Sequence, residues 1–310
     1  MRPLIGLAAQ ALAGSAAILL TATCVAPAAM PPAKHAPSAK DLPAPAPPVA
    51  QPDPQSPFAL VGPHTQGALL IGVAPANTQR LALDGEAVPV APDRRFVIAF
   101  DRDAEPRATL TATLGDGRVI SETLTIAPRA WDISRLSTLP KYPVPQAEFD
   151  RLRPAELAQI NAARAKPTDA AGWGAAMLWP AVGRISTLFG SQRIYANGEA
   201  GSYHSGIDIA LPAGTPVLAP ADGVVILAAD HPFTLEGNLL MIDHGMGLNS
   251  AFLHLSRIDV RTGDHVQRGQ LIGAVGMSGR ATGPHLHWSL RWRNRRIDPL
   301  LAAGPMPVTR

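Results

Sequence analysis

The chain has 310 residues, of which 46% are hydrophobic and 16% are charged, and its formal net charge at neutral pH is +3. This composition supports a folded core and excludes a chain that is disordered throughout. The small positive charge suits an anionic partner such as a cell-wall polymer or a membrane surface, and the lack of a Lys/Arg-rich tract with interleaved aromatic residues argues against a nucleic-acid partner.

The start of the chain has the pattern of an export segment. A charged start at residues 1–3 is followed by apolar and small residues over 4–20. This order predicts a cleaved secretory signal over residues 1–28, or a retained membrane tether through residues 4–23. Lipid attachment at the single cysteine, Cys24, is a third alternative, against which the preceding residues argue. We therefore expect export to the periplasm or cell envelope, and no disulfide in a chain cleaved after the cysteine.

Residues 29–58 are rich in proline and alanine and contain hardly any large apolar residue. Such segments adopt an extended, polyproline-like conformation that cannot build a core. We interpret this stretch as a linker that holds the rest of the chain away from a membrane or from the export machinery.

Short β-like runs fill residues 59–130. Asp84-Gly85 and Asp116-Gly117 are turn signals between them, and the second predicts a β-hairpin. Several short strands at this spacing predict a small β-sandwich of immunoglobulin-like type. The stretch has no cluster of reactive side chains, so we interpret it as a binding or spacing module.

Residues 131–172 contain the clearest helical pattern in the chain. Leu152, Leu157 and Ile160 recur at near-helical spacing, and Pro154 suits the first turn of a second helical part. The sequence predicts a helical connector, which either packs against the following domain or covers part of its groove.

The last region, residues 173–303, changes to short strands and glycine-rich turns without a helix-length period. This pattern predicts an antiparallel β domain, so the whole chain is expected to be mostly β. Seven of the nine histidines lie between His204 and His287, which concentrates the chemistry in this domain.

Two short motifs in this domain bring metal-ligating side chains together. Residues two apart in a strand project to the same side, so His285 and His287 point together. Interpreted as a strand, the other motif places His204 and Asp208 on one face, with Gly206 between them to leave room. Imidazole and carboxylate groups bind zinc, and a catalytic zinc ion keeps three protein ligands and one open position. The two motifs are therefore expected to form one metal site.

The candidate site has more side chains than one tetrahedral shell holds, so some of them must serve as acid–base or oxyanion-stabilising groups. His254 is the fifth candidate. Strand alternation places it on the same face as Phe252, where a packed core histidine is the alternative. His244 fits a turn or a supporting hydrogen bond better, and His231 and His265 lie in polar surroundings. No His-Glu-x-x-His or Gly-x-Ser-x-Gly motif is present, so metal-activated water is the best supported nucleophile.

Three pieces of this domain together resemble the lysostaphin-type zinc metallopeptidases, the LytM or M23 family. They occur in the family's order: His204-x-x-x-Asp208, Phe252-Leu253-His254-Leu255 and His285-Leu286-His287. The resemblance covers about residues 179–299 and does not extend to the upstream modules. One departure is that the family often has tyrosine at the positions of Leu248 and Phe252.

The resemblance implies one zinc ion per chain, with His204, Asp208 and His287 as ligands. It also implies that His254 and His285 are catalytic residues that flank the water without binding the metal. The implied activity is that of a zinc endopeptidase that cuts the peptide cross-links of bacterial peptidoglycan. Two alternatives stay open: a non-catalytic wall-binding protein that activates another hydrolase, and a structural or storage zinc site.

Overall fold

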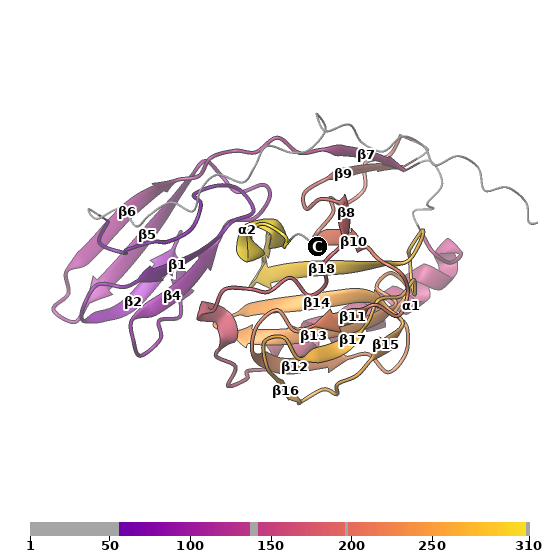
Figure 1. Cartoon of the computed structure of the whole chain (residues 1–310). Coiled ribbons are helices and arrows are strands. Elements are labelled where there is room, and N and C mark those ends of the chain that lie inside the picture. The colour runs from indigo at the N-terminus through magenta and orange to yellow at the C-terminus, as the bar shows by residue number, and fades with distance from the viewer. Residues whose placement is uncertain (1–55, 137–141, 196–197, 308–310) are drawn as a thin grey trace, which may run out of the picture. The chain divides into compact units, whose positions relative to one another are not determined.

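The computed structural model describes residues 56–136, 142–195 and 198–307 (Figure 1). The expected export segment, and the expected linker up to residue 55, lie outside the described residues. No helix in the described ranges is long and apolar enough to cross a membrane. The described chain is mostly β, as the sequence predicts.

The N-terminal module is a sandwich of two small antiparallel sheets. One sheet pairs β1 (Leu69–Val73) with β4 (Arg95–Ala99). The other has the order β3-β2-β5-β6, with β2 (Thr78–Leu83), β3 (Glu86–Val88), β5 (Arg107–Leu114) and β6 (Val119–Thr125). Both turn signals lie in hairpins, β2–β3 and β5–β6, because glycine accepts the positive φ that such turns need. Buried side chains of both sheets share one core.

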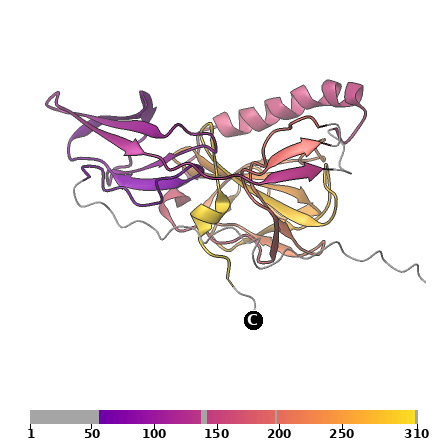
Figure 2. The same cartoon turned by 90° about the horizontal axis from the view of Figure 1, so that it is seen from above.

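The connection to the next region contains a short strand and one long helix. β7 (Ile133–Leu136) pairs in parallel with β9 (Gln192–Tyr195). The helix α1 (Gln146–Ala165) is continuous, so the prediction that Pro154 begins a second helical part is wrong. Its Ile160 and Ala163 pack on apolar side chains of the following sheet, so α1 lies along one face of that sheet (Figure 2).

The C-terminal region is built on an eight-stranded antiparallel sheet with the order β16-β12-β13-β14-β18-β10-β8, in which β19 pairs with β18. Its strands are β8 (Arg184–Thr187), β10 (Ile207–Ala210), β12 (Gly223–Ala228), β13 (Asn238–Gly245), β14 (Leu248–Leu255), β16 (His265–Val266), β18 (His285–Trp292) and β19 (Arg295–Ile297). A second sheet has the order β11-β17-β15, with β11 (Pro216–Leu218), β15 (Arg257–Ile258) and β17 (Leu271–Ala274). Two short helices complete it, η1 (Gly172–Gly174) and α2 (Pro299–Ala303).

Strand β18 lies between β14 and β10 and separates the core from the functional face. Its apolar residues are all fully buried: Leu286, Trp288, Leu290 and Trp292. Because side chains alternate along a strand, the intervening residues project to the opposite face: His285, His287, Ser289 and Arg291. The alternating sequence of this one strand therefore holds the predicted His/His motif firmly above the core.

Candidate metal centre

Neighbouring strands place the predicted carboxylate opposite one of the predicted imidazoles. In the antiparallel pair β10–β18, Asp208 is the direct partner of His287. The Oδ1 atom of Asp208 lies 2.9 Å from Nδ1 of His287. The prediction that these two distant segments lie side by side is therefore confirmed.

His204 reaches the same point from outside the strand. The prediction that it shares a strand with Asp208 is wrong, because β10 begins only at Ile207. Its Nε2 atom nevertheless lies 3.0 Å from Oδ1 of Asp208 and 3.0 Å from Nδ1 of His287. Backbone hydrogen bonds with residues 190 and 191, rather than a sheet ladder, hold the histidine in this position.

Gly206 allows this approach. A Cβ atom at this position would lie 2.3 Å from the backbone oxygen of Trp288 and 2.8 Å from Nε2 of His287. Both distances are shorter than ordinary van der Waals contacts, so a side chain would push the segment away from β18. The glycine between the two motif residues leaves room, as the sequence predicts.

The three converging atoms have the chemistry of a cation site. His204 donates its Nδ1–H to the backbone carbonyl of Leu188 at 3.0 Å, so Nε2 is the ring atom that faces Asp208 and His287. Burial lowers the pKa of His287 to about 4, so this ring is neutral at pH 7. Burial opposes the charge on Asp208, but the facing imidazoles outweigh it and hold the pKa of its carboxyl well below the ordinary value. Two imidazoles and one carboxylate, all buried, fit a single divalent cation.

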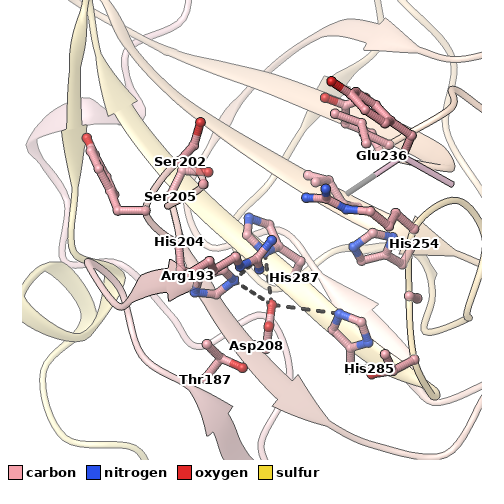
Figure 3. A pocket seen from close by; sticks show the side chains of 18 of the residues that line it. Thr187, Arg193, Ser202, His204, Ser205, Asp208, Glu236, His254, His285 and His287 are labelled. Carbon is pink, nitrogen blue, oxygen red and sulfur yellow. Dashed lines mark hydrogen bonds and ion pairs between the residues drawn. The ribbon is translucent and has the colours of Figure 1, made fainter. Parts of the chain in front are cut away.

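The two remaining histidines lie beside these atoms (Figure 3). The ring centroids of His254 and His285 are 4.7 Å apart, and Nε2 of His285 is 3.7 Å from Oδ1 of Asp208. Each ring uses its Nδ1–H on a backbone carbonyl at 2.8 Å, that of Ser278 for His254 and that of Gly283 for His285. This hydrogen bond fixes Nδ1 as the protonated nitrogen, so Nε2 is the atom that can accept or release a proton. Burial lowers the pKa of His254 to about 3, which keeps that ring neutral.

His254 does not share the face of Phe252, contrary to the strand pattern. Phe252 is fully buried in the core, whereas Leu253 and His254 both line the groove. The reason is the backbone of His254, whose φ of 62° is left-handed and ends the alternation. The family often has tyrosine at position 252, but a hydroxyl on this buried ring would not face the groove.

The groove around the metal centre has a volume of about 410 Å³. Arg193 and Arg280 line it, and the rings of Tyr142 and Phe149, with centroids 5.0 Å apart, also belong to its lining. Figure 3 shows Arg193 beside His204, on the side of Asp208 away from His285. Burial lowers the pKa of Arg193, and the carboxylate of Asp208 acts in the opposite direction. Sequence reasoning missed these residues because they come from separate segments and form no motif.

The other histidines of the domain are placed as the sequence indicates. His244 is fully buried, with Nδ1 2.8 Å from the backbone oxygen of Asp222 and Nε2 2.7 Å from the hydroxyl of Ser250. His231 and His265 have exposed side chains on the surface. None of the three lines the groove.

Comparison with known proteins agrees with this geometry. Residues 202–299 match peptidase family M23. The peptidoglycan DD-endopeptidase ShyA of Vibrio cholerae is 43% identical over 123 residues, which are 40% of this chain and 28% of ShyA. The DD-carboxypeptidase/endopeptidase Mpg of Neisseria meningitidis is 40% identical over 124 residues, which are 40% of this chain and 28% of Mpg. The matched region thus spans little more than a quarter of these curated relatives.

A solved structure from Pseudomonas aeruginosa, assigned to peptidase M23, resembles a larger part of the chain. It superposes with a TM-score of 0.59 at 28% identity and covers 79% of this chain and 96% of its own. The five histidine and aspartate residues of the groove all lie in the family match at 202–299. The C-terminal region of this chain is therefore a peptidase family M23 domain.

Proposed function

We propose that this protein is a zinc-dependent endopeptidase that hydrolyses peptide cross-links of bacterial peptidoglycan. The observation that carries the proposal is the convergence of Nε2 of His204, Oδ1 of Asp208 and Nδ1 of His287 beside two more imidazoles. Imidazole and carboxylate ligands in a three-residue set favour a catalytic zinc ion. The substrate class is supported by relatives that are named peptidoglycan DD-endopeptidases.

In the proposed mechanism the three metal ligands hold the zinc ion, and the two imidazoles that do not bind it transfer protons. When bound, the zinc ion supplies Lewis acidity that polarises the scissile carbonyl and lowers the pKa of a water molecule. His254 and His285 present Nε2 lone pairs to the groove, and one of them accepts the proton of the attacking water. The imidazolium that results donates this proton to the leaving amine, and a protonated ring also stabilises the oxyanion.

The proposed substrate lies outside the cytoplasm, in agreement with the export segment expected at residues 1–28. We propose the periplasm or cell envelope as the place of action. The sandwich at 59–130 and the connector at 131–172 would then carry the M23 domain at 173–303 beyond the linker.

The test is to incubate the purified full-length protein with cross-linked muropeptides, with and without a chelator, and to analyse the products by mass. We expect cleavage that a chelator abolishes and zinc restores. His204→Ala should lose the metal. His285→Ala should keep it but lose about 10²- to 10⁴-fold in turnover, which is typical of one acid–base group.

The surface variant His231→Ala is the matched control and should change neither property, because its side chain is exposed and outside the groove. A zinc-loaded His285→Ala protein with full turnover would contradict the assigned role. A zinc-loaded wild-type protein that cuts no cross-link would favour the non-catalytic activator instead.

A further inference from the structure

A second pocket, of about 220 Å³, lies between α1 and the open face of the main sheet. His287 and Ser205 line both this pocket and the groove of the metal centre, so the two cavities adjoin. Leu239 and Met241 contribute apolar side chains to its wall. Four arginines line it, and we call it the arginine pocket after the three that form no ion pair within the described residues: Arg164, Arg291 and Arg296.

The three arginines come from three different elements. Arg291 lies on β18, on the same face as His287. Arg296 on β19 is the direct strand partner of Arg291. Arg164 belongs to the last turn of α1, which lies across the pocket from the sheet. The fold therefore gathers three positive charges that are scattered in the sequence.

Within the described residues, these guanidinium groups have no carboxylate partners. None of the ion pairs found in residues 56–136, 142–195 and 198–307 includes any of the three. A fourth lining arginine, Arg153, is neutralised by Glu236, which also lines the pocket. The charge of Asp101 acts on Arg291, but its carboxylate accepts a hydrogen bond from the backbone N–H of Arg296 and forms no ion pair with either side chain.

Arg164 is the most unusual member of the group. Its Nε atom is buried and has no hydrogen-bond partner. Burial and the charges of Arg291 and Arg296 outweigh the opposing charge of Glu236 and lower the pKa of Arg164 to about 10, so the side chain stays charged at neutral pH. A cation in the last helical turn interacts favourably with the helix dipole, which could account for an arginine here. However, a cation does not have to be buried for this interaction, as the exposed Lys166 at the same helix end shows. The dipole alone therefore does not explain why the Nε atom of Arg164 is buried without a hydrogen-bond partner.

We propose that the arginine pocket binds a carboxylate of the peptide whose scissile bond lies in the metal groove, so that acidic stem peptides are preferred over amidated ones. Guanidinium groups pair with carboxylates through two parallel hydrogen bonds, and an incoming carboxylate would relieve the mutual repulsion of the three charges. The shared wall at His287 and Ser205 makes a peptide in the groove the natural occupant. This inference rests on the proposed function for its substrate.

A binding measurement tests the inference without cleavage. The probe is an uncross-linked stem tetrapeptide with free carboxylates, compared with the same peptide after amidation, on the metal-free full-length protein. We expect the free acid to bind about 10- to 100-fold more tightly than the amidated peptide. This ratio corresponds to the usual contribution of a hydrogen bond to a charged group. Arg164→Gln should remove this difference, and Arg164→Lys should restore part of it. Inorganic phosphate is added as a competitor, and phosphate that binds as tightly as the peptide would overturn the peptide assignment.

Arg151→Gln is the matched control, because it removes one charge from an exposed position of the same helix. It should leave the preference for the free acid unchanged. Arg291→Gln is the second test variant, and it decides the outcome if Arg164→Gln does not fold. If the folded variant still prefers the free-acid peptide over the amidated peptide, the proposal is overturned.

Cleavage kinetics separate this inference from the proposed function. With zinc-loaded protein and an acidic cross-linked peptide, Arg164→Gln should raise KM about tenfold and leave kcat unchanged. With the amidated peptide it should change neither constant. Equal changes for both peptides would show a structural role and overturn the inference. Absence of cleavage by the wild type would defeat the proposed function, while the binding measurement would still decide the role of the pocket.

Discussion

Gly206 shows how a missing side chain shapes the metal centre. Gly206→Ala would bring a Cβ atom within 2.3 Å of the Trp288 backbone oxygen and 2.8 Å of Nε2 of His287. We expect the free energy of unfolding to fall by about 1–3 kcal/mol, the usual cost of overpacking, and zinc affinity to fall with it. Denaturant unfolding and metal titration measure the two effects.

Gly283→Ala is the control for this substitution. Gly283 precedes the other motif, that of His285 and His287, and does not have a positive φ, and a Cβ atom added there would meet no other atom within 4 Å. We expect wild-type stability and zinc affinity in this variant. A Gly206→Ala protein that behaved like the control would show that the close approach to β18 is not required.

The buried histidines make the stability of the metal-free protein depend on pH. Burial lowers the pKa of His244 below its ordinary value, that of His254 to about 3 and that of His287 to about 4. The unfolded chain takes up these protons near pH 6.5, whereas the folded chain does so only at lower pH. The stabilisation is therefore complete above about pH 6.5 and is lost as the pH falls toward the folded-state values.

We expect each such histidine to remove about 1.4 kcal/mol of stability per pH unit below its unfolded-state pKa. The measurement is denaturant unfolding of the metal-free protein at steps from pH 7 to pH 5. A free energy of unfolding that stays constant across this range would contradict the neutral state of the buried rings.

At the scale of elements, α1 is attached to the segment that positions His254. Arg153 binds Glu236 through two hydrogen bonds of 2.6 and 2.8 Å and also contacts Glu156 at 3.0 Å. The carboxylate of Glu156 accepts the backbone N–H of Thr234 at 2.6 Å and its hydroxyl at 2.7 Å. The backbone oxygen of Glu236 accepts the N–H of His254 at 2.8 Å. The connector helix thus supports a proposed catalytic residue as well as the wall of the groove.

Arg153→Ala tests this support. It would leave two largely buried carboxylates without their partner, so we expect a loss of about 3–5 kcal/mol in the free energy of unfolding. We also expect kcat to fall, because the segment that holds His254 loses its attachment. The control is Arg151→Ala, which removes an exposed arginine from the same helix and should change little. Unchanged stability in Arg153→Ala would mean that the helix does not support the groove.

At the scale of the whole molecule, Asp101 connects the sandwich to the M23 domain. One of its carboxylate oxygens accepts the hydroxyl of Tyr203 at 2.5 Å, and the other accepts the backbone N–H of Arg296 at 2.9 Å. Tyr203 directly precedes His204, a proposed zinc ligand. The upstream module therefore contacts the segment that carries a proposed zinc ligand.

We expect Asp101→Ala to lower the free energy of unfolding by about 1–3 kcal/mol, because the Tyr203 hydroxyl and the backbone N–H of Arg296 lose their acceptor. Zinc affinity should also decrease through the segment before His204. The matched control is Asp103→Ala, whose side chain is 65% exposed and forms a surface ion pair that should contribute little. Identical unfolding curves for the two variants would show that Asp101 does not couple the modules.

The sequence by itself determined those features that depend on local pattern. Alternation along β18 predicts that His285 and His287 project together, and Asp116-Gly117 predicts the β5–β6 hairpin, since both follow from backbone geometry within a few residues. Short local motifs, together with the family resemblance, also identified the five candidate site residues: His204, Asp208, His254, His285 and His287. Element boundaries follow less directly from local pattern, which did not foresee that α1 continues through Pro154.

Only the tertiary structure decided how the separate segments meet. It placed His204 outside β10 and turned His254 into the groove through a left-handed backbone. It also gathered Arg164, Arg291 and Arg296 around one pocket. These features depend on contacts between residues far apart in the chain, which no local spacing encodes. The proposed metal ligands could be identified from the sequence because they lie in short motifs. The three arginines lie on three separate elements, so only folding brings them together.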